Sequence, residues 1–221
     1  MRDCILFFAK YPMPGEVKTR LAEGASPELA AEFYATFVED KLEELIAECS
    51  SDIIVCFAPE KAGGAMRDWL GSELRYFGQK GTDLGRRMEN AFREAFFMGY
   101  ERVVLVGSDI PALSASILQE ALDSLTPEQP CIGPADDGGY YCIGFHKQGF
   151  DPDVFKNMEW STDSVLQQTV SILEEKGLGY HELPPLADTD TIEDVETMVA
   201  LGTSGPLKPR SLALARKLVG A

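Results

Sequence analysis

Hydrophobic and polar positions alternate along the chain in a way that predicts strands followed by helices. Mostly apolar runs, typical of strands, occur at 5–9, 52–58, 74–77 and 102–106, and the last three contain one charged residue each (Asp52, Arg75 and Arg102). Between these runs, apolar residues recur every three or four positions, as on one face of a helix. Helices are therefore expected near 27–49, 66–70, 88–96, 115–125, 160–176, 192–199 and 211–219. This alternation over 221 residues predicts a single α/β domain spanning residues 1–221.

The run at 102–106 is the strand around which the site is expected to be organised. It is followed by Gly107, where the chain turns, by Asp109, and by Pro111, which prevents the strand from continuing. Because open α/β sheets bind ligands beyond the carboxyl ends of their strands, Asp109 is expected to face a ligand crevice. Capping of the next helix is the alternative role, but Ser114 is better placed for it. We therefore interpret Asp109 as a functional residue.

The loop after the first strand carries three cations in a strongly acidic protein. Lys10, Lys18 and Arg20 lie in a segment whose two prolines and Gly15 argue against a helix. The backbone N–H groups of a glycine turn, a lysine ammonium and an arginine guanidinium together suit a polyphosphate. The segment lacks the Walker A spacing, and a solvated basic turn is the alternative interpretation. Its position directly after the first strand favours phosphate binding.

Two glycine-containing turns are further candidates. The turn Gly81–Gly85 places Asp83 at a helix entrance, where this acid either caps the helix or holds a ribose or base. The segment 130–145 predicts a strand, a tight turn at Asp136–Gly139 and a second strand. The adjacent acids and glycines of that turn, beside Tyr140, also suit the binding of a polar acceptor.

A tryptophan and an acidic pair complete the set of candidates. Trp160 precedes a helix that Ser161–Thr162 are suited to cap, and a tryptophan in this position packs more often than it stacks on a ligand. Asp188 and Asp190 precede a helix with Thr191 as its expected N-cap. Such an oxygen-rich pair suits Mg²⁺ or Mn²⁺, although the helix dipole also favours acids in this place.

Charge and cysteine content narrow the functional classes. The chain has 20 Lys and Arg against 36 Asp and Glu, a net charge of −16, which argues against a nucleic-acid-binding surface. It contains no apolar stretch long enough to span a membrane, and its start lacks a cleavage region for a leader. Five cysteines without a C-x-x-C pair favour neither a zinc site nor a disulfide framework. These features predict a cytoplasmic protein that acts on small molecules.

Two other enzyme classes are disfavoured. A serine or cysteine hydrolase needs an activated nucleophile, but the sequence lacks G-x-S-x-G and offers only His146 and His181 as histidine bases. A Rossmann dehydrogenase needs G-x-G-x-x-G after its first strand, and the sequence has no such motif there.

Several motifs together resemble one protein family in their order and spacing. They are Phe8–Lys10, Gly15–Leu21, Gly107–Pro111, Gly133–Tyr140, Trp160–Thr162 and Asp188–Thr191. The set, which covers about residues 4–200, is similar to the bacterial glycosyltransferase-A-like family within the nucleotide-diphospho-sugar transferase superfamily. That superfamily also contains the molybdenum-cofactor and 2-phospholactate guanylyltransferases, whose general plan the chain resembles.

The resemblance implies a three-layer α/β/α sandwich with a mixed, mostly parallel sheet, which holds a nucleotide on its amino-terminal half and an acceptor on its carboxyl-terminal half. It implies Mg²⁺ or Mn²⁺ at Asp109 and Asp190, and catalytic roles for Lys18, Arg20 and Asp109. The residues implied in nucleotide binding are Ala9, Lys10, Gly15, Lys18, Arg20, Gly81, Asp83, Leu84 and Ser108. Those implied in acceptor binding are Asp137, Gly138, Gly139, Tyr140 and Trp160. Relatives tend to carry other residues at Thr82 and Arg86, so the base preference stays open.

The expected activity is metal-dependent transfer from a nucleoside triphosphate or a nucleotide sugar to a small-molecule acceptor. Three cations on the first loop favour nucleotidyl transfer to a phosphorylated acceptor, because the β and γ phosphates leave as pyrophosphate. Glycosyl transfer is the alternative, since the acids at 136–137 and 188–190 suit a metal that stabilises a diphosphate leaving group. The third hypothesis is a nucleotide-binding module without catalytic activity. A turnover measurement distinguishes it from the two transferases. The oligomeric state is left open.

Overall fold

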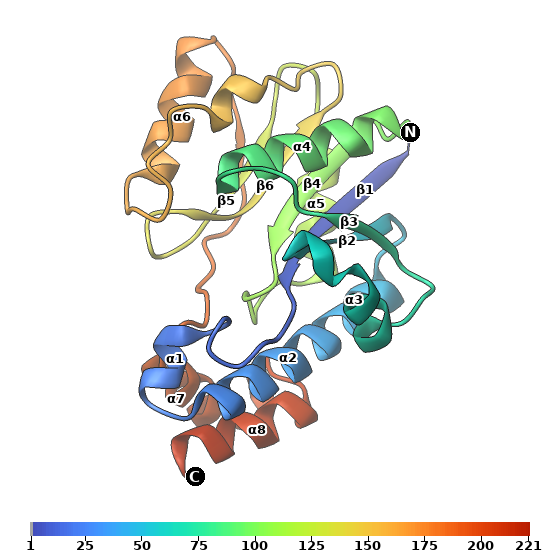
Figure 1. Cartoon of the computed structure of the whole chain (residues 1–221). Coiled ribbons are helices and arrows are strands. Elements are labelled where there is room, and N and C mark those ends of the chain that lie inside the picture. Colours follow the sequence, from blue (N-terminus) through green and yellow to red (C-terminus); the bar gives the residue numbers. More distant parts are fainter. Residues whose placement is uncertain (1) are drawn as a thin grey trace.

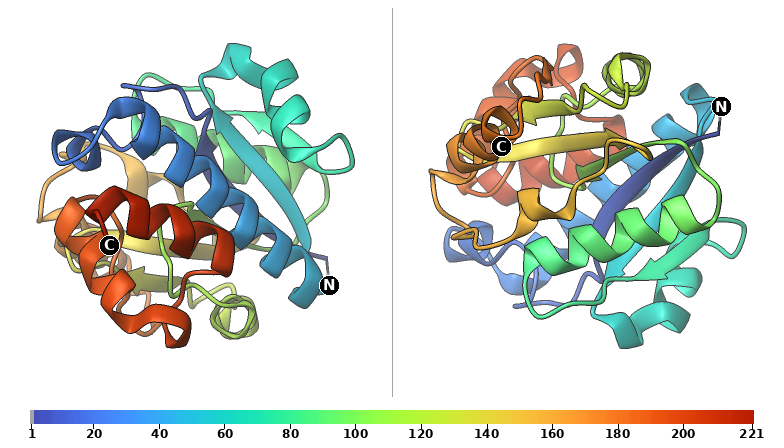
Figure 2. Two further views of the ribbon diagram at one scale, coloured as in Figure 1. Left: turned by 90° about the horizontal axis from the view of Figure 1, so that it is seen from below. Right: turned by 90° about the horizontal axis from the view of Figure 1, so that it is seen from above.

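The computed structural model describes residues 2–221 and contains one seven-stranded sheet with helices on both faces (Figure 1, Figure 2). The strands are β1 (Asp3–Lys10), β2 (Asp52–Ala58), β3 (Arg75–Gly78), β4 (Arg102–Gly107), β5 (Cys131–Pro134), β6 (Tyr140–His146) and β7 (His181–Glu182). The helices are α1 (Thr19–Glu23), α2 (Pro27–Glu48), α3 (Gly63–Leu70), α4 (Leu84–Phe97), α5 (Ala115–Ser124), α6 (Val165–Glu175), α7 (Ile192–Leu201) and α8 (Pro209–Val219). Short 3-10 helices cover Glu60–Ala62, Pro152–Phe155 and Gly202–Ser204. None of the helices between residues 2 and 221 has both the length and the apolar character needed to cross a membrane.

The order in which successive strands are added to the sheet reverses between β1 and β4. Its strand order is β3-β2-β1-β4-β6-β5-β7, and β1 pairs in parallel with both β2 and β4. Strand β6 runs antiparallel to both β4 and β5, so the sheet is mixed and mostly parallel, as expected. The chain therefore builds outward from β1 to β3 and then returns to the other side of β1. Such a switch point leaves a crevice beyond the carboxyl ends of the two central strands.

The alternation of side chains along the strands explains the three layers. In β1, Ile5 and Phe7 pack into an apolar cluster shared with α2, α3 and α5. Leu6 and Phe8 point to the opposite face and pack with α4 and α6. Because both faces are covered, β1 is apolar at every interior position, which is why its sequence shows an unbroken run. The predicted three-layer α/β/α sandwich is confirmed.

A third apolar cluster joins the two ends of the chain. It lies among α1, α2, α7 and α8, on the side of α2 that faces away from the sheet (Figure 1). Asp40 of α2 anchors α8 there, because its carboxylate accepts hydrogen bonds from Arg210 Nε at 2.7 Å and from the backbone N–H of Ser211 at 3.1 Å. Helix α8 has no side-chain cap of its own at Lys208, so Asp40 supplies the missing acceptor.

Three of the expected capping residues cap their helices, whereas Ser161 and Thr162 do not cap α6. Ser26, Ser114 and Thr191 each accept a backbone N–H in the first turn of α2, α5 and α7. In α7 the cap is a capping box, because Asp194 also accepts the backbone N–H of Thr191.

Two expectations about the elements are wrong. The segment after β1 was expected to be non-helical, but its last residues form α1 from Thr19, because the prolines and Gly15 all precede that point. Helix α6 begins at Val165 instead of near Trp160. Ser161 has a left-handed backbone (φ 66°), which a helix cannot include, and Thr162 donates back to the carbonyl of Glu159 at 2.7 Å.

Asp40→Ala is expected to lower the free energy of unfolding by about 2–4 kcal/mol, because it leaves the buried N–H and hydroxyl of Ser211 without an acceptor. Glu43→Ala is the matched control, since Glu43 pairs with the same Arg210 at 3.1 Å but is 72% exposed. An exposed pair of this kind contributes less than about 1 kcal/mol. Urea unfolding of both variants tests the assignment, and equal losses of stability would contradict it.

Candidate active site

Predicted site residues at the ends of two neighbouring strands lie together at the switch point of the sheet. Lys10 ends β1, and Gly107 ends the neighbouring β4, with Ser108 and Asp109 directly after it. Buried Tyr34 of α2 ties the two strand ends together, because its hydroxyl accepts the backbone N–H of Lys10 and hydrogen-bonds with Ser108 Oγ, both at 2.9 Å. The backbone on either side of the crevice is therefore fixed by one buried side chain.

A second residue of α2 fixes the chain that follows Asp109. The ammonium of Lys41 is buried and donates to the backbone carbonyls of Pro111 at 3.0 Å and Leu113 at 2.7 Å. Burial is the main cause of its lowered pKa, and Glu44 opposes that shift. Lys41 thus fixes the backbone that follows Asp109, although Lys41 lines neither of the two pockets described below.

The centre of the site is an ion-pair cluster around Lys18. Its Nζ lies 2.9 Å from Asp109 Oδ2 and 2.8 Å from Asp190 Oδ1. The Lys18 side chain is 5% exposed, whereas Asp109 and Asp190 are 39% and 34% exposed. Burial lowers the pKa of Lys18, but attraction to the two carboxylates outweighs burial and raises the pKa above its ordinary value. The lysine is charged and holds the two acids side by side.

Three elements distant in sequence build this cluster. Lys18 occupies a left-handed backbone position (φ 46°) immediately before α1, an uncommon conformation for a residue with a side chain. The segment that carries Asp190 is fastened to the end of β4, because the backbone N–H of Thr189 donates to the carbonyl of Asp109 at 3.1 Å. Asp194 of the α7 capping box accepts the N–H of Asp190 at 2.9 Å. Asp190 is therefore fixed from both sides.

One pocket, called the cationic pocket here, is lined mostly by residues that precede Asp109 in the sequence. It has a volume of about 510 Å³. It contains the four cations Lys10, Lys18, Arg20 and Arg87. The other residues that line it are Phe8, Ala9, Glu16, Val17, Thr19, Tyr34, Gln79, Leu84, Gly107, Ser108, Asp109, Ser161 and Asp190. The guanidinium of Arg20 lies 3.6 Å from Asp190 Oδ2, and its side chain is 66% exposed, so it remains accessible to a ligand.

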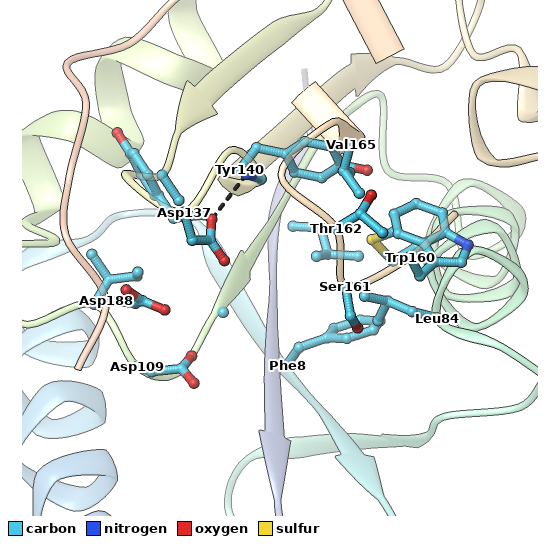
Figure 3. A pocket seen from close by; sticks show the side chains of 17 residues that line it. Phe8, Leu84, Asp109, Asp137, Tyr140, Trp160, Ser161, Thr162, Val165 and Asp188 are labelled. Atoms are coloured by element: carbon cyan, nitrogen blue, oxygen red, sulfur yellow. Dashed lines mark hydrogen bonds between the residues drawn. The ribbon is translucent and has the colours of Figure 1, made fainter. Parts of the chain in front are cut away.

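A second pocket, the acidic pocket, adjoins the first and has a volume of about 270 Å³. Its acids are Asp109, Asp137 and Asp188. The other residues that line it are Phe8, Leu84, Met88, Leu105, Gly107, Ile110, Ala135, Gly139, Tyr140, Tyr141, Trp160, Ser161, Thr162 and Val165. Figure 3 shows the three carboxylates on one side of this pocket and Phe8, Leu84 and Trp160 on the other. Asp109 lines both pockets and stands at their junction.

The carboxyl group of Asp188 is perturbed by its surroundings. Burial is the largest cause, followed by repulsion from Asp190 and Asp137, and together they raise the pKa of Asp188 to about 6. A set of acids crowded in this way is electrostatically unfavourable until a cation joins it. The sequence singled out the Asp188 and Asp190 pair, but the implied metal site included only Asp190.

Several predicted site residues lie together in these pockets. Ala9, Lys10, Lys18, Arg20, Leu84 and Ser108 line the cationic pocket, and Asp137, Gly139, Tyr140 and Trp160 line the acidic pocket. Sequence reasoning did not propose Arg87, Gln79, Phe8, Ser161 or Thr162, which also line them. Arg87 lies in the first turn of α4, and its proximity to Lys10 depends on the packing of that helix, which no local motif encodes.

Four other predicted residues have structural roles and line neither pocket. Asp83 caps α4, since its Oδ1 accepts the N–H of Arg86 at 2.9 Å, and this hydrogen bond is the main cause of its lowered pKa. Gly15 and Gly81 have positive φ angles (79° and 146°) that shape their turns. Gly138 has φ 85°, and a Cβ there would lie 2.2 Å from the carbonyl oxygen of Asp163. Of the two roles open to Asp83, the structure supports helix capping.

Trp160 is both a packing residue and part of the acidic pocket. A Cβ on Gly85 would lie 2.6 Å from the Trp160 ring, so the ring packs directly on the first turn of α4. The other face of the pocket comes from the hairpin between β5 and β6, where Gly139 N–H donates to Asp137 Oδ1 at 2.8 Å. The backbone carbonyl of Gly138 also accepts the N–H of Leu166, which joins the hairpin to α6.

The donor atoms at Asp109 and Asp190 suit Mg²⁺ or Mn²⁺. Among residues 2–221 no group of three or more His, Cys, Asp and Glu side chains is arranged as a ready-made metal site. Mg²⁺ does not need such a group, because it is commonly held by one or two carboxylates together with substrate phosphates and water. Asp109 gives Oδ2 to Lys18 and keeps Oδ1 for such an ion, whereas Asp190 gives Oδ1 to Lys18 and its Oδ2 lies 3.6 Å from the exposed guanidinium of Arg20. The residues present therefore fit an ion that takes one or two carboxylate oxygens.

Comparison with known proteins identifies the family. A family profile described as "Uncharacterized protein conserved in bacteria (DUF2064)" matches residues 41–162, which is more than half of the chain. The chain belongs to this family. No curated protein sequence matches it.

Solved structures extend the comparison. A protein from Desulfovibrio desulfuricans G20, described as a candidate nucleotide-diphospho-sugar transferase, is 41% identical with a TM-score of 0.92, over 100% of this chain and 96% of that protein. A nucleotidyl transfer enzyme from Methanothermobacter is 16% identical with a TM-score of 0.55, over 88% of this chain and 90% of the other. A cytidylyltransferase from Leptospira borgpetersenii is 16% identical with a TM-score of 0.52, over 100% and 95%. The last two share the fold alone with this DUF2064 protein. The expected nucleotide-diphospho-sugar transferase fold is confirmed.

Gly138→Ala is expected to destabilise the protein more than Gly177→Ala, because only the first substitution adds a clash. Both glycines have positive φ (85° and 70°), but a Cβ on Gly177 meets no atom within 4 Å in the described part of the chain. Gly177→Ala therefore measures the backbone cost, about 1–2 kcal/mol, and Gly138→Ala is expected to exceed it by at least about 1 kcal/mol. Urea unfolding checks this, and equal losses would show that the hairpin does not pack on Asp163 as described.

Proposed function

We propose that this DUF2064 protein is a metal-dependent nucleotidyltransferase, which moves a nucleoside monophosphate from a nucleoside triphosphate to a small-molecule acceptor. The fold relatives described as nucleotidyl or cytidylyl transferases support a transferase. The observation that carries the proposal is the distribution of cations around Asp109. All four cations line one pocket, together with Glu16, Asp109 and Asp190, whereas the residues among 2–221 that line the next pocket include Asp109, Asp137 and Asp188 and no Lys, Arg or His. The cationic pocket is the place for the triphosphate, and the acidic pocket is the place for the acceptor.

The cations suit a triphosphate better than a diphosphate. Transfer of a nucleoside monophosphate releases pyrophosphate, whose two phosphate groups carry most of the charge that the site must stabilise. Lys10, Arg20 and Arg87 surround the pocket and are the groups that bind these oxygens. Arg20 is the most suitable for the leaving group, because its exposed guanidinium can grip two oxygens at once.

In this proposal Lys18 positions the acids of the site, in place of the direct phosphate contact that its sequence position suggested. Its ammonium is buried and engaged with Asp109 and Asp190, so it positions these carboxylates at the junction of the pockets. Mg²⁺ bound by the two acids would neutralise phosphate oxygens and orient the triphosphate. Phe8 and Leu84, which line both pockets, cover the junction with apolar surface and restrict water there.

Glycosyl transfer from a nucleotide sugar is the second candidate. The acidic pocket favours it, because carboxylates beside an aromatic wall can hold the sugar of such a donor. That reaction would release a nucleoside diphosphate in place of pyrophosphate.

The products released distinguish the two reactions. The protein is incubated with Mg²⁺, each of the four nucleoside triphosphates and a mixture of small acceptors, and pyrophosphate is assayed. The proposal predicts pyrophosphate that depends on both protein and acceptor. Release of a nucleoside diphosphate from a nucleotide sugar, with no pyrophosphate from any triphosphate, would make the protein a glycosyltransferase.

Arg20→Ala is expected to lower turnover about 10²-fold, the loss typical of one donor that stabilises transition-state charge. Its melting temperature should stay within about 2 °C of the wild type, because the side chain is largely exposed. Arg216→Ala, an exposed arginine of α8, is the control and should change neither quantity. Normal turnover in Arg20→Ala would remove this guanidinium from the mechanism.

Lys18→Met is expected to behave differently from Arg20→Ala. Because Lys18 is buried between two carboxylates, its loss leaves them facing each other, and the melting temperature should fall together with turnover. Added Mg²⁺ should restore part of the melting temperature in this variant and change the wild type less. Thermal unfolding with and without Mg²⁺ measures this, and an unchanged melting temperature in Lys18→Met would contradict the positioning role.

A further inference from the structure

We propose that the acidic pocket takes an unphosphorylated, polyhydroxylated ring, such as a neutral or amine-bearing sugar or cyclitol. The inference rests on the proposed function, because it names the class of acceptor that would meet the nucleotide at Asp109. It departs from the phosphorylated acceptor that was expected from the sequence.

The first argument is the charge of the pocket. Within the range 2–221, the residues that line it include no Lys, Arg or His, whereas Asp109, Asp137 and Asp188 all contribute carboxylates. Lys18 engages Asp109, but no cation of the described chain lies within 4.0 Å of Asp137 or Asp188. A phosphate group needs cations or convergent N–H donors when it leaves water, and carboxylates repel it. The acceptor part of the pocket therefore disfavours a phosphate ester.

A divalent cation at Asp109 and Asp190 does not reverse this conclusion. Such an ion would lie at the junction, where the phosphates of the donor compete for its charge. Asp137 lies on the hairpin between β5 and β6, and it lines the acidic pocket but not the cationic pocket. Its charge would still face the acceptor when the donor and the ion were bound.

The second argument is the shape and polarity of the walls. Figure 3 shows the carboxylates of Asp109, Asp137 and Asp188 facing the apolar and aromatic side chains of Phe8, Leu84 and Trp160 across the pocket. A sugar or cyclitol ring has the matching division, with C–H groups on its faces and hydroxyl donors at its rim. Carboxylates accept hydrogen bonds from such hydroxyls, and they attract an amine more strongly. The volume of about 270 Å³ suits one ring.

Trp160 provides a direct signal for this binding. The chain has two tryptophans, and Trp69 of α3 is not among the residues that line the pocket. In a Trp69→Phe background, fluorescence reports on Trp160 alone. The protein, in Mg²⁺, is titrated with glucose, glucosamine and myo-inositol, and with glucose 6-phosphate, glucosamine 6-phosphate and myo-inositol 1-phosphate as their matched partners. Each unphosphorylated ring is expected to bind at least about tenfold more tightly than its phosphate ester, with glucosamine the tightest.

Asp137→Asn sharpens the test. Asparagine keeps an oxygen that can accept the N–H of Gly139, so the hairpin is retained while the charge is lost. The variant should bind glucosamine about tenfold more weakly and glucose with little change, and it should narrow the difference between each ring and its ester. Ester binding as tight as that of the parent ring, or a lack of response to every unphosphorylated ring, would overturn the proposal.

A separate titration keeps this outcome distinct from the proposed function. The four nucleoside triphosphates are titrated into the same protein by calorimetry, which reports on the cationic pocket. Failure of triphosphate binding with normal ring binding would contradict the proposed reaction only. Normal triphosphate binding with a preference for the phosphate esters would contradict the acceptor class only.

Discussion

The site depends on the ion pairs that Lys18 makes with Asp109 and Asp190. These two carboxylates come from the end of β4 and from the segment before α7, and without a cation between them they would repel each other. Lys18 reaches them from a left-handed residue at the start of α1. The pairs therefore join the first loop, the central strand and the carboxyl-terminal helices, and they define the point where the two pockets meet.

Within residues 2–221, the fold places four cations in the pocket on one side of that point and none among the residues that line the pocket on the other. The cations lie at the end of β1, in the residues that follow it and at the start of α4, on the half of the sheet that runs from β1 to β3. The acids of the second pocket come from the β5–β6 hairpin and from the segment before α7. A transferase needs two substrates held in different chemical surroundings with their reacting atoms adjacent, and this division provides both surroundings.

Local patterns predicted the strand at 102–106 and the position of Asp109 after it, whereas the three layers were implied by the resemblance to a known family. An unbroken apolar run identifies a strand covered on both faces, and an acid at its carboxyl end faces the crevice. The burial of Lys18 was not predictable, since it depends on a single left-handed residue and on two distant segments. Asp83 and Gly138 were predicted to bind ligands but line neither pocket, and local sequence does not separate a capping acid or a turn glycine from a ligand-binding residue. Arg87 was missed because only the packing of α4 brings it to Lys10.

Under the proposed function, nucleotide binding at the junction needs a divalent cation held by Asp109. Calorimetry of the four nucleoside triphosphates tests it most directly, with wild-type protein and Asp109→Asn, each in Mg²⁺ and in EDTA. The wild type is expected to bind at least one triphosphate in Mg²⁺ and to lose at least about tenfold in affinity in EDTA. Asp109→Asn should show weak binding that Mg²⁺ does not strengthen. Equal affinity of wild type and variant, with and without Mg²⁺, would contradict the account.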